Sequence, residues 1–555
     1  MAELVVDGAP GKVLPPTSMR TVVAASCAGT AFEWYDFFIF GSLIQIISKT
    51  FFAELGAAAG LIAALALFGV GFAFRPLGAL IFGGVGDRIG RKAAFLITVT
   101  MMGGATFCIG LLPTFAQVGK LAPLLLILLR VIQGTALGGQ YGGAAIYVAE
   151  HAPPNRRGYF TGWVQTSAAF GLVGALSVIF VVRKLTGEAA FADWGWRIPF
   201  FVSAGLVATS IWMRMKLSES PTFQKMKDAG TDSRAPYSEA FGRWSNLKLV
   251  LIAFFSLMCA QGAYWYTVFF YSEVFLEKFL KVDGPFANLM IMLGAIVSAP
   301  LYVFFGWLSD KVGRKWVMWF GMTLGALSLF PGFHLMSQAA NPALVAAVSR
   351  TPIVVVADPA NCSVQFDPTG KAKFVTSCDI ARSTLANAGI TYSNRVGAPG
   401  AEAYVSVGMA QLAVGDGRGL APPALKALTA DFSDRLNAAL AKAGYPAKSE
   451  PSQRNAPLIL AVLITFVVAA TALYGPMAAG LAELFPAQVR YTALSLPYHL
   501  GAGWIGGFQP VASFAIVVAT GNIYAGLWYP VAFTAISVVA AIFLLPETRG
   551  RSLDA

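Results

Sequence analysis

The chain has 555 residues, of which 56% are hydrophobic and only 12% are charged, and its formal net charge is +12. This composition is far too apolar for a soluble protein of that length, so it predicts a polytopic membrane protein. The positive charge does not indicate a nucleic-acid-binding protein, because basic residues confined to the loops on one side of a bilayer account for it.

Apolar runs of roughly 20 residues, the length of one bilayer crossing, follow one another along the chain. Residues 1–20 are polar and contain proline, so we expect no cleavable signal peptide, and the first run itself directs insertion. The sequence therefore predicts an all-α membrane protein with twelve transmembrane helices in two halves of six. The predicted spans are 21–48, 60–82, 93–112, 121–149, 159–182, 197–215, 247–275, 286–308, 316–336, 456–481, 492–519 and 525–545.

The polar stretches between these spans define the predicted domains. Lysine and arginine are concentrated in the turns after the even-numbered spans, so the positive-inside rule predicts that both termini and the central linker face the cytoplasm. The predicted parts are a cytoplasmic tail (1–20), a six-helix bundle (21–215), a cytoplasmic linker (216–246), helices seven to nine of a second bundle (247–336), a periplasmic insert (337–455), helices ten to twelve (456–545) and a cytoplasmic tail (546–555).

Two pairs of motifs recur between the halves. The turn that begins at Gly83 reads Gly-Gly-Val-Gly-Asp-Arg-Ile-Gly-Arg-Lys, and the turn that begins at Gly306 reads Gly-Trp-Leu-Ser-Asp-Lys-Val-Gly-Arg-Lys. The pattern Glu-x-x-Pro-x-x-x-Arg occurs at Glu150 and again at Glu483. The first pair is offset by 223 residues and the second by 333, so an insertion of about 110 residues must lie between the eighth and tenth spans.

Residues 337–455 supply that insertion, and their charge and proline content differ from those of their flanks. Pro352–Ala357, Lys373–Thr376 and Ala401–Val407 have the composition of strands, and Ala424–Ala443 has the periodicity of an amphipathic helix. The insert is therefore predicted to be a small α+β domain on the periplasmic side, between helices nine and ten.

The five cysteines fall into two groups. Cys27, Cys108 and Cys259 lie in predicted spans, where we expect them to be small packing residues. Cys362 and Cys378 lie in the insert, where a disulfide suits an oxidising compartment and two free thiols are the alternative.

Charged residues inside the first two spans are functional candidates, because an ionised side chain at bilayer depth costs about 3 kcal/mol or more. Glu33 and Asp36 are three residues apart, so they share a helical face. Arg75 in the second span is the expected partner of this acidic pair, because it keeps its charge when buried. The spacing leaves open whether such a pair is static or is opened by a proton or an anionic substrate, and the alternative is that both acids only anchor a helix near the interface.

Other polar residues are candidates for the walls of a central cavity between the two halves. In the fourth span, Gln140 and Tyr141 lie among glycines that permit local unwinding, or that only allow close packing. Aromatic residues of membrane helices are also typical of packing and of interfacial belts, and a histidine there either titrates or stays neutral and hydrogen-bonded. The candidates in the second half are Gln261, Tyr264, Trp265, Tyr266, Tyr498, His499 and Gln509.

The two Gly-x-x-x-Asp-Arg/Lys-x-Gly-Arg-Lys turns resemble the signature loops of the major facilitator superfamily. Further motifs resemble its metabolite:H+ symporter family over nearly all of the chain outside 337–455, whereas the insert departs from the usual pattern of that family. These motifs are Glu-Trp-Tyr-Asp-Phe-Phe from Glu33, Phe-Arg-Pro-Leu-Gly from Phe74, Arg-x-x-Gln-Gly from Arg130, Gly-Gly-Gln-Tyr-Gly-Gly from Gly138, Trp-Gly-Trp-Arg-Ile-Pro-Phe from Trp194, Leu-Ser-Glu-Ser-Pro from Leu217 and Pro-Glu-Thr-Arg-Gly from Pro546.

The resemblance implies a bacterial inner-membrane protein that takes up organic acids, or else proline or betaine, together with protons. It also implies roles for the matching residues in coupling, in substrate binding and in a cytoplasmic gate. The coupling and substrate candidates are Glu33, Asp36, Arg75, Arg130, Gln133, Gln140, Tyr141, Gln261, Tyr264 and Tyr498. The gating candidates are Asp87, Arg88, Arg91, Glu150, Arg157, Asp310, Lys311, Arg314, Glu483 and Arg490.

The expected function is uptake of a small organic anion by alternating access, in which the two halves rock about a central site. A buried arginine suits a carboxylate, whereas a zwitterion such as betaine or proline would also use the acidic pair. We expect the proton as coupling ion, no cofactor, no nucleic acid, contact with membrane lipids, and a single chain as the complete transporter. A non-transporting sensor that uses the insert is a different hypothesis, and an enzyme is not expected, because the sequence has no phosphate loop or metal-binding spacing.

Overall fold

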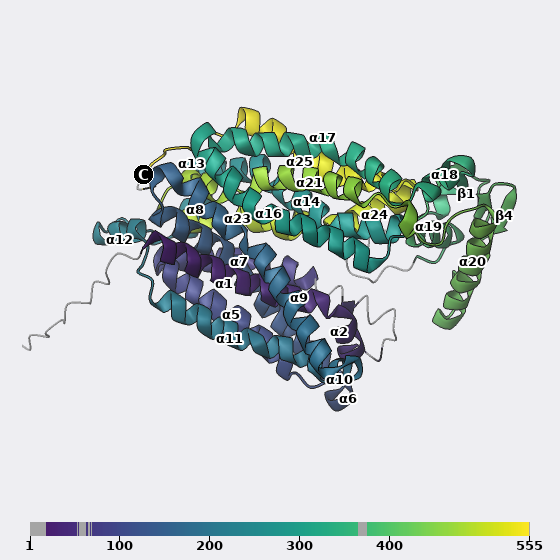
Figure 1. Ribbon diagram of the computed structural model, residues 1–555, viewed down its shortest axis with the longest axis horizontal. Helices are drawn as coiled ribbons and strands as arrows, with labels where there is room; N and C mark the ends of the chain where they lie inside the picture. Colours follow the sequence, from purple (N-terminus) through teal and green to yellow (C-terminus); the bar gives the residue numbers. More distant parts are fainter. Residues whose placement is uncertain are drawn as a thin grey trace, which may run out of the picture.

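The computed structural model describes residues 18–52, 54, 63–64, 67, 69–363 and 374–553. Two helical bundles lie side by side with their long axes roughly aligned, and a small mixed unit lies at one end of the second bundle (Figure 1). We call this the insert end. The opposite end carries the two repeated turns that begin at Gly83 and Gly306, which we call the Gly-Asp-Arg turns after the residues that they share. We call this end the motif end.

The first bundle is built from the chain up to Met215. The first predicted span is one long helix, α1, which breaks at Leu43 and continues as a short helix along the insert end. Part of the second predicted span lies outside the described residues, and its remainder continues to Arg88. The helices are α1 (Met19–Ser42), α2 (Ile44–Phe51), α4 (Arg75–Arg88), α5 (Arg91–Leu111), α6 (Phe115–Val118), α7 (Leu121–His151), α8 (Arg157–Gln165), α9 (Ser167–Thr186), α10 (Glu188–Asp193) and α11 (Ile198–Met215).

The second bundle follows a linker that contains α12 (Pro221–Asp228) and η4 (Ser238–Gly242). Two of its spans contain π-helical turns, which rotate the side chains that follow and frequently occur at functional sites. They are η5 (Phe254–Met258), η6 (Thr267–Tyr271) and η7 (Phe275–Phe279) in the seventh span and η10 (Leu500–Gly506) in the eleventh. The helices are α13 (Trp244–Ala253), α14 (Cys259–Tyr266), α15 (Ser272–Val274), α16 (Gly284–Val312), α17 (Arg314–Ala340), α21 (Ala456–Tyr474), α22 (Met477–Leu484), α23 (Arg490–His499), α24 (Gln509–Thr520) and α25 (Trp528–Phe543).

Among the described residues, ten helical segments are long and apolar enough to cross a membrane, and they correspond to the predicted spans three to twelve. The helix α1 is also long enough, with 24 residues, but Glu33 and Asp36 interrupt its apolar character. The protein is therefore an all-α multi-pass membrane protein with a small sheet-containing insert.

The insert contains a four-stranded sheet in the order β2-β1-β3-β4, in which β1 and β2 are parallel and the other pairs are antiparallel. In this register Val355 of β1 lies between Asn394 of β2 and Val405 of β3. The elements are α18 (Pro342–Arg350), β1 (Ile353–Ala357), α19 (Ser377–Asn387), β2 (Ser393–Val396), β3 (Tyr404–Val407), β4 (Ala410–Ala413) and α20 (Pro422–Lys442).

Two of the predicted strands and the predicted helix correspond to β1, β3 and α20. The predicted strand at Lys373–Thr376 is wrong where it is described, because residues 374–376 are irregular and Thr376 caps α19 by accepting a hydrogen bond from the Asp379 amide at 3.1 Å. Lys373 lies outside the described residues. The strands β2 and β4 were not predicted, because Ser-Asn-Arg-Val and Ala-Gln-Leu-Ala lack the apolar alternation of a half-buried strand.

The core of the insert lies between one face of the sheet and the helices α19 and α20. Val355 and Val405 of the sheet and Phe432 and Leu436 of α20 are buried in it. Cys362 and Cys378 form a disulfide beside this core, with their Cα atoms 5.2 Å apart.

Candidate functional site

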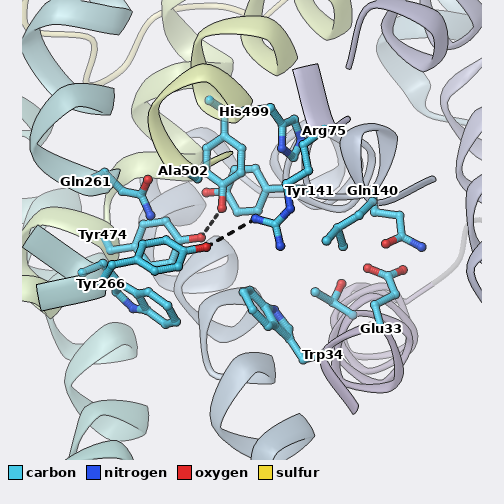
Figure 2. A pocket seen from close by; sticks show the side chains of 14 residues that line it. Glu33, Trp34, Arg75, Gln140, Tyr141, Gln261, Tyr266, Tyr474, His499 and Ala502 are labelled. Atoms are coloured by element: carbon cyan, nitrogen blue, oxygen red, sulfur yellow. Dashed lines mark hydrogen bonds between the residues drawn. The ribbon is translucent and has the colours of Figure 1, made fainter. Parts of the chain in front are cut away.

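A small cavity of about 40 Å³ lies at the interface of the two bundles (Figure 2). Its volume holds no more than a few water molecules, so a larger solute enters only when the bundles separate. The lining comes from α1 (Thr30, Glu33, Trp34), α4 (Arg75), α7 (Leu137, Gln140, Tyr141), α14 (Gln261, Trp265, Tyr266), α21 (Tyr474), α23 (Tyr498, His499) and η10 (Ala502).

Arg75 is the one arginine or lysine in this lining, and only 3% of it is exposed. Its Nη1 donates to the Tyr266 hydroxyl at 3.5 Å, which is one of the dashed lines in Figure 2, and its guanidinium lies 4.4 Å from the ring centre of Phe72. The Nε and Nη2 atoms of Arg75 have no hydrogen-bond partner within the described chain. This buried guanidinium thus retains two nitrogen donors, Nε and Nη2, without a hydrogen-bond partner beside the cavity.

The predicted pairing of Arg75 with Glu33 or Asp36 is wrong. Glu33 instead accepts from Arg214 of α11, with 3.3 Å between Oε1 and Nη2. Gly29, one turn before Glu33, makes this possible, because a Cβ there would lie 2.0 Å from Arg214 Nη2. Arg214 was not among the predicted site residues, although a buried arginine in the otherwise apolar run Ile-Trp-Met-Arg-Met was a sign of an internal partner.

Asp36 lies outside the cavity, in the interior of the first bundle. It accepts a hydrogen bond from Ser203 of α11 at 2.6 Å, and it also contacts the hydroxyl of Thr106. Gln133 donates to Thr106 at 2.7 Å and accepts from Arg130 at 2.9 Å. The predicted coupling residues Asp36, Gln133 and Arg130 therefore belong to one polar network that links α1, α5, α7 and α11.

The aromatic side of the cavity joins the two bundles. Tyr141 of the first bundle stacks on Tyr498 of the second, with ring centres 3.8 Å apart, and the Tyr498 hydroxyl lies 2.5 Å from that of Tyr474. Trp265 donates to the Tyr302 hydroxyl at 3.0 Å and lies 6.0 Å from Trp34 across the interface. The cavity thus has an aromatic wall and, at Arg75, a cationic one.

Several predicted wall residues do line the cavity, namely Gln140, Tyr141, Gln261, Trp265, Tyr266, Tyr498 and His499. Tyr264 does not, because it lies on the other side of Gln261 around the helix and its hydroxyl donates to Phe466 O at 3.3 Å. Gln509 also lies elsewhere and donates to Ser513 at 3.1 Å. Tyr474 and Trp34 were not among the predicted wall residues, since nothing in their local sequence separates a lining aromatic residue from a packing one.

The first Gly-Asp-Arg turn binds the second bundle at the motif end. The carboxylate of Asp87 accepts from the backbone amides of Tyr491 at 3.2 Å and Thr492 at 2.8 Å, in the first turn of α23. Arg91 forms an ion pair with this carboxylate, with 2.7 Å between Nη1 and Oδ1, and its Nη2 donates to Ala487 O at 2.8 Å. A carboxylate at a helix N-terminus is favourable, because the free amides and the helix dipole both attract negative charge.

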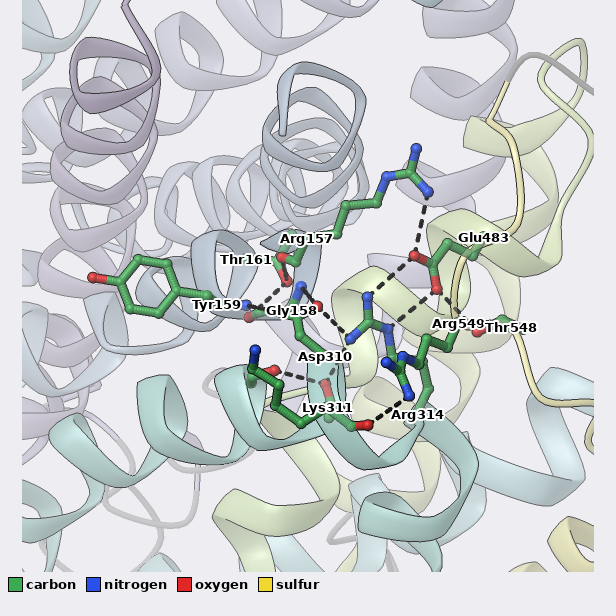
Figure 3. A network of polar contacts seen from close by, with 12 residues as sticks. Arg157, Gly158, Tyr159, Thr161, Asp310, Lys311, Arg314, Glu483, Thr548 and Arg549 are labelled. Atoms are coloured by element: carbon green, nitrogen blue, oxygen red, sulfur yellow. Dashed lines mark hydrogen bonds and ion pairs between the residues drawn. The ribbon is translucent and has the colours of Figure 1, made fainter. Parts of the chain in front are cut away.

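The second turn repeats this arrangement in the opposite direction (Figure 3). The carboxylate of Asp310 accepts from the amides of Gly158 at 2.9 Å and Tyr159 at 2.8 Å, in the first turn of α8. Arg314 lies 2.5 Å from it. Each bundle therefore contributes one aspartate that caps a helix of the other bundle.

The repeated Glu-x-x-Pro-x-x-x-Arg motifs also pair across the bundles. Arg490 binds Glu150 at 2.7 Å, and Arg157 binds Glu483 at 3.4 Å. Glu483 also forms an ion pair with Arg314 of its own bundle, with 3.2 Å between Oε2 and Nε. All of these side chains are buried, so the motif end is closed by a paired network.

Two gating candidates lie outside that network. Arg88 is exposed and lies 6.0 Å from the ring of Tyr237, and the Lys311 side chain is exposed while its carbonyl accepts from Arg549 at 2.5 Å. Both residues follow the aspartate by one position, which turns their side chains away from the other bundle.

Two further acids, which were not predicted from the sequence, take part at this end. Glu219 accepts from the Lys92 amide at 3.2 Å, and Glu547 accepts from the Arg314 amide at 2.9 Å, so each caps the helix that follows a Gly-Asp-Arg turn. Burial raises the pKa of Glu219 above its usual value. Gly90 precedes the first of these helices with φ +124°, and a Cβ there would lie 2.3 Å from Glu219.

The interface is hollow toward the insert end. A cleft of about 850 Å³ lies between α1 and α9 of the first bundle and α14, η6, α15 and α16 of the second, and Trp265 lines both this cleft and the central cavity. The described conformation is thus closed at the motif end and open toward the insert end.

Comparison with known proteins gives relatives over most of the chain outside the insert. The sugar (and other) transporter family matches residues 21–239 and 438–555. The shikimate transporter of Escherichia coli K12 is 37% identical over 317 residues, which cover 57% of this chain and 72% of that protein. The proline/betaine transporter of Salmonella typhimurium is 33% identical over 340 residues, which cover 59% of this chain and 66% of that protein.

Among solved structures, the proton:xylose symporter XylE has the same fold. It superposes with a TM-score of 0.61 at 14% identity over 97% of this chain and 98% of that chain. The chain belongs to the sugar (and other) transporter family, and the relatives that it matches are membrane transporters.

Proposed function

We propose that this transporter takes up a small organic acid together with protons, by alternating access. The observation that carries the proposal is Arg75, a buried cation whose Nε and Nη2 have no partner among the described residues. Planar guanidinium groups bind carboxylates through two parallel N–H···O bonds, and a carboxylate in the cavity would accept one such bond from Nε and one from Nη2.

The rest of the lining favours an acid with a ring and hydroxyl groups. Tyr141, Tyr498 and Trp265 offer flat apolar faces, and both side-chain polar atoms of Gln140 and both ring nitrogens of His499 lack partners in the described chain. Buried polar groups of this kind require partners, which substrate hydroxyls provide. The 37% identity to a shikimate transporter supports the same class of substrate.

We propose Asp36 as the proton carrier and Glu33 as a charge that responds to the state of the substrate site. Within the described chain no cation forms an ion pair with Asp36, and its partners are the hydroxyls of Ser203 and Thr106, so it can gain a proton without leaving a buried charge unpaired. Glu33 is bound to Arg214 and lines the cavity, so its protonation would release that arginine.

The difference between the two ends of the interface supports alternating access. We assign the motif end to the cytoplasm by the positive-inside rule, which makes the cleft at the insert end the entry for solute and places both termini in the cytoplasm of a bacterial inner membrane. Inward opening requires that Asp87 and Asp310 release the helices of the opposite bundle. In the proposed cycle, substrate and proton binding stabilise closure of the cleft and thereby favour this release.

The test is uptake into proteoliposomes with an imposed proton gradient. Labelled shikimate, quinate, citrate, 2-oxoglutarate, proline and betaine are each supplied to wild type, to Arg75→Ala and to Arg88→Ala, which removes an exposed arginine from the same helix. We expect one of the acids to accumulate with wild type and Arg88→Ala and to fall at least a hundredfold with Arg75→Ala. Accumulation of no acid, or an acid whose uptake does not need Arg75, would contradict the proposal.

A zwitterion is the second candidate, because Trp34, Trp265 and Tyr266 form an aromatic surface of the kind that binds quaternary ammonium groups. The proline/betaine relatives favour it as well. Accumulation of betaine that survives Arg75→Ala but not Trp265→Ala would identify this case. Binding without accumulation of any compound would identify a sensor instead.

A further inference from the structure

The insert contains a second hollow, separate from the central cavity. It is a groove of about 570 Å³ between the C-terminal end of α19 and one side of α20, closed at its base by Lys281, just beyond the seventh span. The lining residues are Lys281, Thr384, Asn387, Ala388, Ile390, Thr429, Ser433, Asn437, Leu440, Ala441, Tyr445, Pro446 and Ala447.

The wall from α20 is a polar stripe. Thr429, Ser433 and Asn437 are four residues apart and therefore lie on one side of the helix, next to the stripe of Phe432 and Leu436 that packs on the sheet. Residues of an amphipathic helix beside a buried stripe ordinarily face solvent. Thr429 and Ser433 are half-buried and Asn437 is exposed, and all three line the groove, so hydroxyl and amide groups lie along one side of it.

The opposite wall contains a polar atom that lacks a partner. Thr384 is buried, with 8% of the residue exposed, and its Oγ1 has no hydrogen-bond partner within the described chain. An unsatisfied buried hydroxyl costs free energy unless a bound molecule or water completes it. It therefore marks a position where a ligand hydroxyl fits.

The base of the groove is cationic. Lys281 Nζ donates to Ala388 O, which leaves two of its three N–H directions, and the ammonium of Lys278 lies nearby, 3.3 Å from Asn387. Burial and the neighbouring Lys278 lower the pKa of Lys281. No aspartate or glutamate is among the described lining residues, so the groove has positive charge without an internal counter-ion.

The backbone of Lys281 is held in a costly conformation. Its φ is +59°, and it is the one non-glycine residue in the described chain with a positive φ. Ser449, which follows α20 in the chain, donates its amide to Lys281 O at 3.0 Å, so the insert itself maintains this conformation. The backbone of Lys281 is thereby held beside the groove, while the ammonium is bound to Ala388 O.

We propose that the groove between α19 and α20 is a second solute site, which binds a small hydroxylated carboxylate. The carboxylate lies on Lys281, and the hydroxyl groups bond to Thr384 and to the stripe of Thr429, Ser433 and Asn437. This inference rests on the proposed function for the class of solute, because an acid that the transporter carries is the solute that a site beside its entry would collect.

The groove is connected to the transport site through the chain. It lies at the end of the seventh span, whose α14 supplies Gln261, Trp265 and Tyr266 to the central cavity. The insert also binds the end of the eleventh span, where the Tyr392 amide donates to Gly521 O at 2.8 Å. Solute bound in the groove is therefore held on the bundle that carries half of the transport site.

The test is the stoichiometry of equilibrium binding to the full chain in nanodiscs, with labelled shikimate and quinate as separate probes. Arg75→Ala removes the proposed central site, so the binding that remains reports the groove. In this background we compare Ser433→Val/Asn437→Leu, which removes polar groups from the groove, with Ala438→Leu, which adds an apolar side chain to an exposed position of α20 outside the lining.

We expect two molecules of at least one probe per chain in wild type and one in Arg75→Ala. Ser433→Val/Asn437→Leu is expected to weaken the remaining site at least tenfold, whereas Ala438→Leu leaves it unchanged. The groove proposal is overturned if Arg75→Ala binds neither probe, or if the remaining binding is insensitive to the groove variant. Binding that needs the groove residues but is unaffected by Arg75→Ala would instead overturn the central carboxylate site alone.

Discussion

The motif end and the central cavity are both buried and charged, but they use charge in opposite ways. At the motif end, the carboxylates of Asp87 and Asp310 are saturated by two backbone amides and an arginine each. In the cavity, Arg75 has one long hydrogen bond, and its Nε and Nη2 donors have no hydrogen-bond partner among the described residues. A network whose polar groups are all paired holds the two bundles together, whereas a group without a partner can bind a ligand. We call the paired network of the motif end the lock, and this difference distinguishes it from the central cavity.

The largest expected effect comes from the proton carrier of the first bundle. Asp36→Asn keeps a polar group near Ser203 but cannot exchange a proton, so we expect gradient-driven accumulation in proteoliposomes to be lost while exchange of internal for external substrate persists. Ser203→Ala, which removes only the hydrogen bond at 2.6 Å, is the milder control. If accumulation survives in Asp36→Asn, a group other than Asp36 carries the proton.

Arg75→Lys distinguishes a ligand-binding guanidinium from a charge that only balances its surroundings. Lysine keeps the charge but not the planar fork, so loss of one charged hydrogen bond, about 1.5–3 kcal/mol, lowers kcat/KM for uptake by roughly ten- to a hundredfold. Initial rates over a range of substrate concentrations measure it. An unchanged kcat/KM would mean that Arg75 acts as a point charge or does not touch substrate.

The lock predicts equal effects from its two halves. Asp87→Asn and Asp310→Asn each weaken one helix cap, so we expect both to open the motif end to a similar extent. The loss of one charge-assisted hydrogen bond should raise the population of the open state about tenfold. The measurement is alkylation of Ser495→Cys, a buried position of α23 between the lock and Tyr498, in a chain whose three free cysteines are alanine. A large effect from one aspartate alone would show that the repeated turns are not equivalent in function.

The smallest expected effect tests the backbone of the lock. Gly90→Ala and Gly119→Ala both place a side chain at positive φ, which costs about 1–3 kcal/mol of folding stability. Only the Cβ at residue 90 meets Glu219, at 2.3 Å, while nothing lies within 4 Å of a Cβ at residue 119. We therefore expect a larger drop in Tm for Gly90→Ala, measured in detergent, and equal drops would mean that the Glu219 cap contributes nothing.

Much of the lock was predictable from repeated motifs. Glu150, Arg157, Glu483 and Arg490 were identified as a duplicated pattern, and the structure shows that each glutamate binds the arginine of the other copy. The cap residue Glu219 was not assigned, although it stands in the motif that follows the sixth span. Its role depends on the approach of the linker to the start of α5, which no local spacing reveals.

The cavity was predicted less well, for a geometric reason. Spacing along a helix shows which residues share a face, so Gln261 and Trp265, one turn apart, were both found among the wall candidates. Spacing does not show how one helix is rotated against another, and the partner of Glu33 was therefore assigned to Arg75 instead of Arg214. Tyr264 was placed on the wall for the same reason.

The sequence alone determined two properties, the positions of the membrane spans and the position of the insert. The first depends on the free energy of transferring each residue into the membrane, and the second depends on the number of residues between repeated motifs. The apolar runs define the spans, and the unequal offsets of two repeated motifs locate the insert. Only the tertiary structure decided which charges meet, that Arg75 remains without an acid among the described residues, and that the insert binds the second bundle at Lys281 and Gly521. Burial is a property of single residues, whereas pairing requires two helices to be packed at a defined rotation and height.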